Sequence, residues 1–463
     1  MVFSSLLFMF VFLVAVLAIY YVLPAKLRNL WLFIVSILFY GIGEPSYVLL
    51  MFFSITVNYI GGLLIGKWQD QKQKKLAVLI GCVVINLVLL GYFKYAGFAV
   101  RLIRNIPIFA NMVIPEIALP VGISFYTFQT MSYIVDVYRG SCPAQKNYIT
   151  FGAYVALFPQ LVAGPIVRYV DIEEQLMHRR ENMELFTKGV RLFLVGLAKK
   201  VLLANRLGLM WAALKPGDGG VLGSWLGIIA YTLQIYLDFS GYSDMARGLG
   251  NMFGFEFVKN FDYPYISTSI TEFWRRWHIS LGAWFREYVY IPLGGNRKGS
   301  GRMILNLAIT WMLTGLWHGA SYNFVLWGIY FGLLLVIEKL FLNKYLKKMP
   351  KVINHIYALF FIVFGWIIFD FADMAQMGSF IASMFSGKNG LLTDSAAYTV
   401  VSFLPLLIVS IVSCLPVGKK LYDRFENTKA AVVFEVVACL IVLILCTASL
   451  ISSSYNPFLY YRF

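Results

Sequence analysis

Charged side chains are scarce in this chain. Among its 463 residues they account for 13%, whereas hydrophobic residues account for 60%. Soluble globular domains carry about 25% charged residues, so this composition argues against an ordinary soluble protein. Runs of about 20 apolar residues recur along the whole sequence, and a helix of that length crosses a bilayer. We therefore predict an all-α polytopic membrane protein with about eleven transmembrane helices, plus re-entrant or interfacial helices.

Cysteine is also rare, and no two cysteines are spaced as a CxxC pair. This absence argues against both a zinc site and a disulfide framework. The cysteines are better explained as small buried hydrophobic side chains. They are Cys82, Cys142, Cys414, Cys439 and Cys446. We expect no metal site.

Acidic residues are outnumbered, because 23 Asp and Glu stand against 39 Lys and Arg, for a net charge of +16. A basic excess can indicate nucleic acid, but in a membrane protein it more often reflects Lys and Arg in cytoplasmic loops. Basic residues gather at 66–75, 344–351 and 419–429, whereas the loop 43–46 has none. Basic loops inside place the N-terminus and the C-terminal tail outside the plasma or inner membrane. No nucleic-acid partner is expected.

Internal repeats and low-complexity linkers are absent, so we expect one membrane-embedded domain over residues 1–463. It would comprise N-terminal helices over 1–118, a catalytic core over 119–341, and C-terminal helices with an aromatic tail over 342–463. The first apolar run lacks the basic start and cleavage site of a signal peptide and is expected to be retained as a transmembrane helix. Spans are predicted at 3–23, 29–42, 47–66, 76–93, 119–138, 303–317, 321–341, 353–370, 397–415 and 430–450.

Two stretches are too polar or too interrupted for a lipid-facing span. Residues 98–118 mix arginine with apolar residues and are expected to lie in the interface plane. Residues 271–302 contain five arginines and a lysine among aromatic residues. We predict that they form short re-entrant or interfacial helices on the cytoplasmic side.

Histidine occurs only four times, and His318 stands in the motif Leu-Trp-His-Gly-Ala at 316–320, after a long apolar run. An ionisable side chain in such a run is costly in lipid and is a functional candidate. We predict a general base that removes a proton from a hydroxyl as it attacks an acyl carbon. The alternative is a histidine that is merely hydrogen-bonded inside the bundle. The adjacent Gly319 lets another group approach the backbone closely.

His278 lies beside Arg275 and Arg276 in the motif 274–281. One interpretation is an anchor at the headgroup boundary, where Trp and Arg are common. The other is a site for the phosphate or pyrophosphate of a nucleotide-bearing acyl donor, because arginine forks match phosphate oxygens. His278 would then orient the donor or stabilise a developing oxyanion. Asp238, in another apolar run, is expected to form a structural ion pair with an arginine.

The C-terminal segment 456–463 is aromatic, whereas chain ends are usually polar and disordered. It is expected to dock in the bundle or the interface. A role as an aromatic anchor and a further functional role are both open.

These motifs together make the chain similar to the membrane-bound O-acyltransferase (MBOAT) family. The likeness is greatest to the bacterial branch that includes the membrane subunits of alginate O-acetylation. It covers nearly the whole sequence. The motifs that carry it lie at 2–5, 91–95, 119–128, 164–166, 238–246, 274–281, 293–297 and 316–320.

The resemblance implies that His318 is the near-invariant histidine of the family and that His278 is its second histidine. It also implies a bundle perforated by a central tunnel, with a cytoplasmic donor entrance and an outer funnel. Tyr460, in an F-x-Y-x-x-F ending formed with Phe458 and Phe463, becomes a candidate to relay the acyl group outward. Donor-binding candidates from the matching motifs are Trp274, Arg275, Arg276, Asn296 and Arg297.

The implied activity is transfer of an acetyl group from a cytoplasmic donor, with acetyl-CoA as the expected co-substrate and no permanently bound cofactor. The acceptor would be an extracellular or cell-wall polysaccharide such as alginate, reached through an SGNH-type acetyltransferase partner outside the cell. D-alanyl transfer to teichoic acid is an alternative within the family. A transporter of polysaccharide precursors would show inverted repeats, and none is found. A non-catalytic scaffold that recruits an extracellular transferase remains open.

Overall fold

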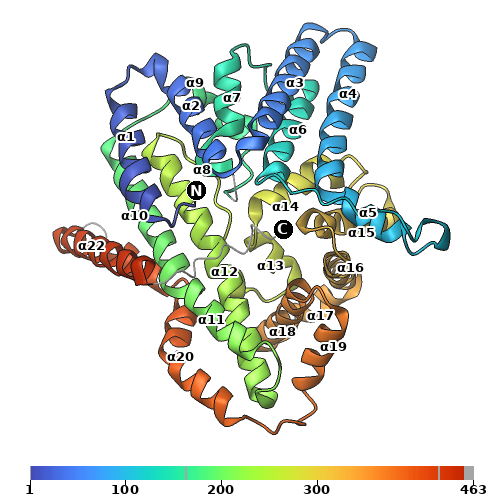
Figure 1. Cartoon of the computed structure of the whole chain (residues 1–463), viewed down its shortest axis with the longest axis vertical. Helices are drawn as coiled ribbons and strands as arrows, with labels where there is room; N and C mark the ends of the chain where they lie inside the picture. Colours follow the sequence, from blue (N-terminus) through green and yellow to red (C-terminus); the bar gives the residue numbers. More distant parts are fainter. Residues whose placement is uncertain (1, 162–163, 426–427, 453–463) are drawn as a thin grey trace. The chain divides into compact units, whose positions relative to one another are not determined.

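In the part of the chain that the structure describes, the regular secondary structure is helical. The computed structural model describes residues 2–161, 164–425 and 428–452, and no strand occurs within them (Figure 1). This confirms the predicted all-α class. Among these described residues, eight helical segments are long and apolar enough to cross a membrane: Ala25–Gly43, Pro45–Lys67, Lys72–Ile103, Gly220–Met252, Tyr322–Leu346, Lys351–Asp370, Asp394–Ser413 and Lys429–Ser452. The chain is therefore a multi-pass membrane protein.

Other predicted spans form shorter or less apolar helices. The predicted first span corresponds to an apolar helix over Phe8–Val22. The predicted spans at 119–138 and 303–317 form helices α6 (Ile123–Arg139) and α15 (Gly299–His318), which are not among the eight. The polar stretch 271–302 is broken into short helices, as its composition predicts.

The chain divides into two compact units, and the single domain predicted from the sequence stays a prediction. The first unit contains Met1–Phe193 and Met245–Val258, and the second contains Leu194–Asp244 and Lys259–Phe463. Two long helices contribute to both: α10 (Met183–Ala198) and α12 (Gly220–Met252). The other helices of the first unit are α1 (Leu13–Val22), α2 (Ala25–Gly43), α3 (Val48–Lys67), α4 (Lys72–Leu90), α5 (Ala96–Ile103), α6, α7 (Tyr148–Ala156), α8 (Phe158–Leu161) and α9 (Tyr169–Met177).

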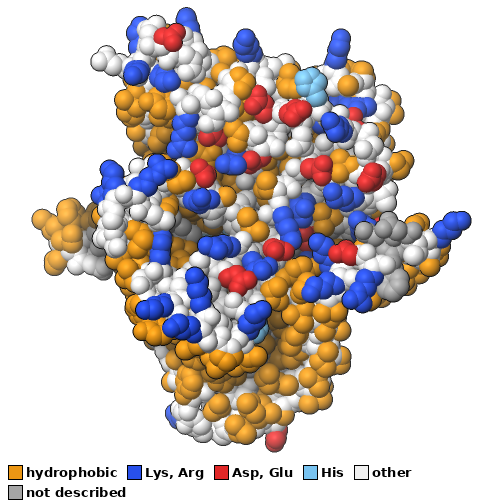
Figure 2. Space-filling view, turned by 180° about the vertical axis from the view of Figure 1, so that it is seen from behind, with side chains coloured by type: hydrophobic (Ala, Val, Ile, Leu, Met, Phe, Trp, Pro, Cys, Tyr) orange, Lys and Arg blue, Asp and Glu red, His pale blue; other side chains and the backbone are white. Residues whose placement is uncertain are grey.

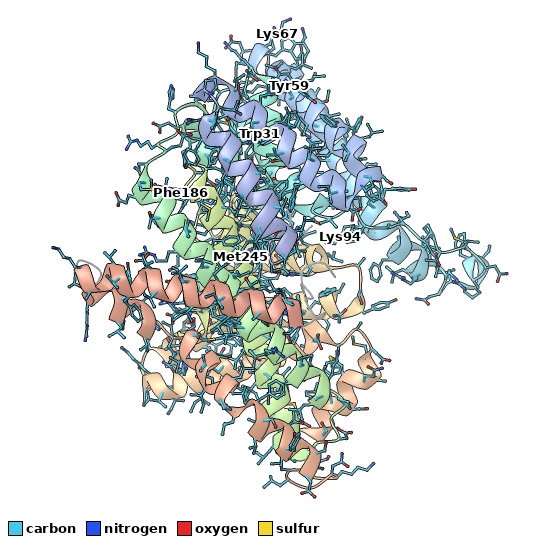
Figure 3. The ribbon with its side chains drawn as sticks, turned by 60° about the vertical axis from the view of Figure 1, so that its left-hand side comes forward. Trp31, Tyr59, Lys67, Lys94, Phe186 and Met245 are labelled. Atoms are coloured by element: carbon cyan, nitrogen blue, oxygen red, sulfur yellow. The ribbon has the colours of Figure 1, made fainter. Side chains whose placement is uncertain are left out.

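Polar side chains join helices inside the first unit. Asn58 of α3 and Asn86 of α4 hydrogen-bond reciprocally at 3.2 and 2.9 Å, and Thr130 of α6 donates to Asn86 Oδ1 at 3.2 Å. Hydrogen bonds of this kind hold membrane helices together where lipid offers no polar partner, each contributing about 0.6–2 kcal/mol. Trp31 of α2 donates to the Val16 carbonyl of α1 at 3.1 Å (Figure 3).

The remaining helices belong to the second unit. They are α11 (Asn205–Leu214), α13 (Ile270–Arg276), α14 (Ile279–Phe285), α15, α16 (Tyr322–Ile337), α17 (Asn343–Leu346), α18 (Lys351–Asp370), α19 (Met374–Ser383), α20 (Asp394–Ser413), α21 (Val417–Phe425) and α22 (Lys429–Ser452). Helix α22 exposes apolar side chains along its length, including Phe434 and Ile444, as expected of a helix that faces lipid. Figure 2 shows hydrophobic side chains over wide areas of the molecular surface.

Helices α15 and α16 form a tight hairpin. Two glycines, Gly315 and Gly328, face each other, and a Cβ on Gly315 would lie 3.1 Å from the Gly328 Cα. Small residues allow membrane helices to approach at backbone distance. The hairpin turns directly after His318, where the sequence predicts its bend. Helix α16 also packs on α18, so these three helices form the frame of the site described below.

Candidate active site

His278 occupies a strained position between helices α13 and α14. Its φ of 45° and ψ of 53° lie in the left-handed region, which costs a residue other than glycine on the order of 1–3 kcal/mol. Asn260 holds the turn, because its carbonyl accepts the Ile279 N–H at 2.9 Å and its Oδ1 accepts the Ser280 N–H at 3.2 Å and the Ser280 hydroxyl at 2.9 Å. The surrounding structure therefore fixes the direction of the imidazole.

The same asparagine sets the protonation of His278. Its Oδ1, which already accepts from Ser280, lies 3.2 Å from His278 Nδ1, so that ring nitrogen acts as the donor. Burial lowers the pKa of His278 to about 3, because the charged imidazolium loses its hydration. The residue is thus a neutral imidazole at physiological pH, with its lone pair on Nε2. Such a nitrogen accepts a proton or a hydrogen bond.

The two predicted histidines belong to one aromatic cluster in the second unit. The His278 ring lies 4.7 Å from the Phe239 ring and 5.8 Å from the Trp317 ring, measured between centroids. The His318 ring lies 5.0 Å from the same Trp317 ring. Trp317 therefore contacts both imidazoles, and the structure brings His278 and His318 together although forty positions separate them.

His318 is the last residue of α15 and is buried, with 4% of its surface exposed. Its ring lies 4.9 Å from that of Trp327 in α16 and 5.2 Å from that of Phe369 in α18. A Cβ at the following residue, Gly319, would overlap the ring of Phe324. Only glycine leaves room for this close approach, as the motif predicts.

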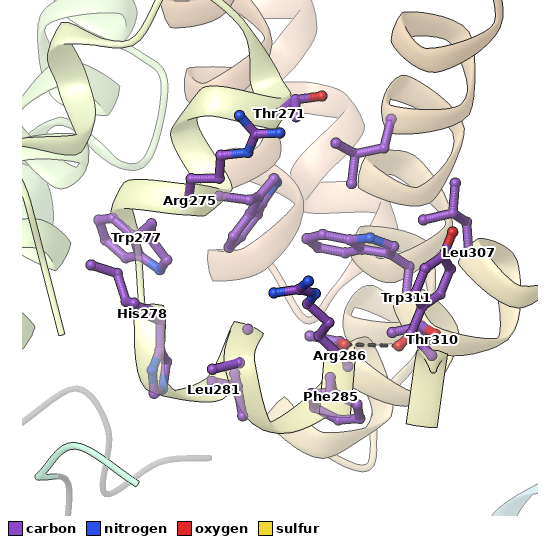
Figure 4. Close-up of a pocket in the computed structure, with 17 residues that line it drawn as sticks. Thr271, Arg275, Trp277, His278, Leu281, Phe285, Arg286, Leu307, Thr310 and Trp311 are labelled. Carbon is purple, nitrogen blue, oxygen red and sulfur yellow. Dashed lines mark hydrogen bonds between the residues drawn. The ribbon is translucent and has the colours of Figure 1, made fainter. Parts of the chain in front are cut away.

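A pocket of about 440 Å³ opens beside His278. Residues of α13, α14, the π-helical turn η7 (Arg286–Tyr290), α15 and α16 line it, and most of them are apolar or aromatic. Figure 4 shows the predicted site residues Arg275 and His278 among the labelled lining residues, and Trp274 also lines the pocket. His318 does not line this pocket. Trp317 contacts both His318 and His278, and His278 does line the pocket.

The arginines of this region separate into two groups. Arg275 and Arg286 line the pocket, and Arg286 comes from η7 (Figure 4). Arg276 instead donates to Glu272 Oε1 at 3.0 Å and to Asp262 Oδ2 at 3.1 Å. The pKa of Asp262 is lowered by its hydrogen bond from Lys259 and further by Arg276. Arg276 thus ties α13 to the preceding loop.

Arg286 is the functional candidate that the sequence analysis missed. The sequence did give a reason to consider it, since it is one of five arginines in the stretch 271–302. It stands outside the short motifs, however, and only the turn between α14 and α15 brings it to the pocket wall.

Asn296 and Arg297 lie outside the pocket wall. Both are exposed and follow the turn at 293–295. Asn296 Oδ1 accepts from the Tyr290 hydroxyl and from Lys339 Nζ, the latter at 2.7 Å. Tyr290 lines the pocket, so Asn296 touches the site through that tyrosine. Their predicted part in donor binding stays a prediction.

Asp238 forms the ion pair predicted for it, but with a lysine instead of an arginine. Lys200 Nζ lies 2.5 Å from Asp238 Oδ1, and the two side chains are 3% and 2% exposed. Lys200 belongs to the π-helical turn η5 (Lys199–Ala204) after α10. Gly241 allows α12 to lie close to the end of α10, since a Cβ there would lie 2.7 Å from the Gly196 carbonyl. The expectation of an arginine was wrong because the partner sits in an apolar run far along the chain.

The aromatic tail cannot be placed in this site. Phe458, Tyr460 and Phe463 lie outside the residues that the structure describes. The proposed acyl relay at Tyr460 therefore stays a prediction. Among the described residues, no group of three or more His, Cys, Asp and Glu side chains could hold a metal ion.

Comparison with known proteins identifies the family. The model of the membrane-bound O-acyltransferase family matches residues 143–380, which include both histidines. The chain is 43% identical over 422 residues to a probable alginate O-acetylase of Azotobacter vinelandii, covering 89% of this chain and 84% of that protein. It is 38% identical over 492 aligned positions to the probable alginate O-acetylase of Pseudomonas putida, covering 100% of both.

A more distant relative is the peptidoglycan O-acetyltransferase of Helicobacter pylori, which is 31% identical over 428 residues, covering 84% of this chain and 81% of that protein. The family match spans half of the sequence and agrees with the helical, multi-pass architecture. The resemblance seen in the motifs is thereby confirmed. The chain belongs to the membrane-bound O-acyltransferase family and is an O-acyltransferase.

Proposed function

We propose that the protein transfers an acetyl group from cytoplasmic acetyl-CoA to the outer side of the membrane, where it is passed to a polysaccharide. The observation that carries this proposal is the pocket that places Arg275 and Arg286 beside the neutral imidazole of His278. Guanidinium forks suit the phosphates of a nucleotide donor. The apolar walls suit the pantetheine arm and a small acyl group.

His318 is the proposed general base. It removes a proton from an acceptor hydroxyl while the hydroxyl oxygen attacks the thioester carbon, and the collapse of the tetrahedral intermediate breaks the C–S bond. The CoA thiolate leaves and takes up a proton. The lone pair on His278 Nε2 supports a role in orienting the donor by accepting a hydrogen bond. A donor to the oxyanion would need the opposite tautomer.

The names of the relatives support acetyl as the transferred group and a polysaccharide as the acceptor, since they are alginate and peptidoglycan O-acetylating proteins. We propose that a tunnel through the bundle connects a cytoplasmic donor entrance with an outer funnel. Tyr460 would accept the acetyl group as a phenyl ester, and a serine of an SGNH-type partner outside the cell would then receive it. The basic loops support a cytoplasmic position for 66–75 and outer positions for both termini.

The test is reconstitution of the purified protein in liposomes with radiolabelled acetyl-CoA. The expected result is CoA release with transfer of label to protein or to an added acceptor, and loss of both in His318→Ala. His178→Ala is the matched control, because His178 is exposed and lies in the first unit. A wild-type protein that neither releases CoA nor takes up label contradicts acetyl transfer and favours the scaffold alternative.

A further inference from the structure

Glu338 is a buried carboxylate that grips the start of helix α13. It is the first residue of the π-helical turn η8 (Glu338–Leu342), which continues α16, and it is 0% exposed. Its Oε1 accepts the backbone N–H of Ile270 at 2.6 Å. Its Oε2 accepts the N–H of Thr271 at 2.8 Å and the Thr271 hydroxyl at 2.5 Å. A buried charge of this kind is stable only when such donors surround it.

These bonds complete the cap of α13. The first N–H groups of a helix have no partner within the helix and need acceptors from elsewhere. Ser269 Oγ accepts the Glu272 N–H at 3.0 Å, as a local cap does. Glu338 serves the two preceding N–H groups from 67 and 68 positions further along the chain. The start of α13 is therefore fixed to α16 and η8 by tertiary contacts.

Helix α13 lines the pocket and is connected with His318 through one side chain of α16. Thr271, Trp274 and Arg275 of α13 line the pocket. Trp327 of α16 lies 5.3 Å from the Trp274 ring and 4.9 Å from the His318 ring. Helix α16 with η8 thus contacts α13 at its first turn and one turn later, and it contacts the proposed base as well.

We propose that Glu338 is a positioning residue for the acyl donor: it fixes α13 so that Arg275 and Thr271 face the pocket in register with His318. This inference rests on the proposed function, because the donor that Arg275 binds is the proposed acetyl-CoA. It assigns no chemical step to Glu338. The carboxylate acts through the orientation of α13.

The chemistry of the cap requires a carboxylate. Glutamine has one acceptor oxygen, and its amide NH2 is a donor. In Glu338→Gln the amide NH2 would face either Ile270 or Thr271, so one backbone N–H would lose its partner. Aspartate keeps both acceptor oxygens but is shorter by one methylene. Glu338→Asp is therefore expected to restore part of the function that Glu338→Gln loses.

The experiment compares wild type, Glu338→Gln and Glu338→Asp with Glu256→Gln as the control. Glu256 is an exposed glutamate of the first unit, so its loss is expected to change neither constant. In liposomes with radiolabelled acetyl-CoA, Glu338→Gln is expected to raise KM for the donor roughly tenfold and to lower kcat much less. In an Arg275→Ala background the same substitution is expected to add less than about twofold, because the two residues act through one contact.

Hydrogen exchange separates positioning from mere stability. Faster exchange at residues 269–273 is expected in Glu338→Gln, whether or not the protein is turning over. Faster exchange with an unchanged KM would show that the cap is only structural and would overturn the proposal. A full additional KM increase in the Arg275→Ala background would also overturn it. If Glu338→Gln does not accumulate, Glu338→Asp takes its place, and faster exchange at residues 269–273 with an unchanged KM again contradicts the proposal.

Failure of the proposed function would be visible separately. A wild-type protein that releases no CoA contradicts acetyl transfer itself and this inference with it. An active wild type whose KM is matched by Glu338→Gln contradicts this inference alone.

Discussion

The imidazole of His278 and the indole of Trp317 are in contact, with ring centroids 5.8 Å apart and planes at 70°. His318 follows Trp317 directly in the sequence. Its ring contacts both the Trp317 ring and the Trp327 ring. Trp317 therefore connects His278, which lines the pocket, with the proposed base His318.

Loss of the proposed base is expected to abolish turnover without unfolding the protein. Removing a general base commonly lowers a rate by ~10²–10⁴-fold. His318→Ala should therefore show normal membrane abundance and a kcat lowered by at least about a hundredfold in the liposome assay. Near-normal polysaccharide acylation in complemented cells, at matched protein level, would rule out this role.

The pocket arginines are expected to differ from Arg276. Replacing Arg275 and Arg286 with alanine should raise KM for acetyl-CoA by about ten- to a hundredfold, more than it lowers kcat, because ground-state binding is lost. Arg276→Ala breaks the ion pairs with Glu272 and Asp262 and should lower stability with little change in KM. Steady-state kinetics on purified variants shows which arginines bind the donor and which only stabilise the structure. The reverse pattern would mean that Arg276 binds the donor.

The stability of the protein is expected to depend on Lys200 and Asp238 being present together. Asp238→Asn leaves a buried lysine charge without its counter-ion, which costs about 3–5 kcal/mol. Replacing both residues with apolar ones of similar size should recover much of this loss. Thermal unfolding in detergent measures the difference, with the exposed pair Lys188–Glu256 as control, where the cost should be about 0–1 kcal/mol. A double variant as unstable as the single one would refute the argument.

Tyr460→Phe keeps an aromatic ring at its position and removes only the hydroxyl. If Tyr460 carries the acetyl group, this variant should release CoA but deliver no acetyl group to polysaccharide when the partner is present. A phenol has a pKa near ~10 and needs a base to act as a nucleophile. Transfer at the normal rate would show that the tail is only an anchor.

The orientation of the chain can be tested by cysteine labelling in intact cells. We expect Lys72→Cys to be protected from an impermeant thiol reagent, because we propose that the basic loop 66–75 faces the cytoplasm. Ser46→Cys, in the exposed turn before α3, is expected to react. Labelling at position 72 would reverse the proposed topology.

Local patterns in the sequence were sufficient for the helical class, most spans and the two histidine motifs. They could not reveal what depends on contacts between distant segments. The hydrogen bond from Ile270 of α13 to Glu338 joins residues 68 positions apart, and the partner of Asp238 is a lysine inside an apolar run. The left-handed backbone at His278 also has no local signal, since glycine or asparagine would be the usual residue there.

The close packing of α15 against α16 fixes the position of His318 at the end of α15. A methyl group on Gly328 would lie 2.5 Å from the Trp311 carbonyl, so the two helices would have to separate. Gly315, against which Gly328 packs, precedes His318 by one helical turn, and any separation displaces the imidazole with it. Gly315 and Gly328 carry no side chain and touch no substrate, yet a larger residue at either position is expected to lower activity by moving His318.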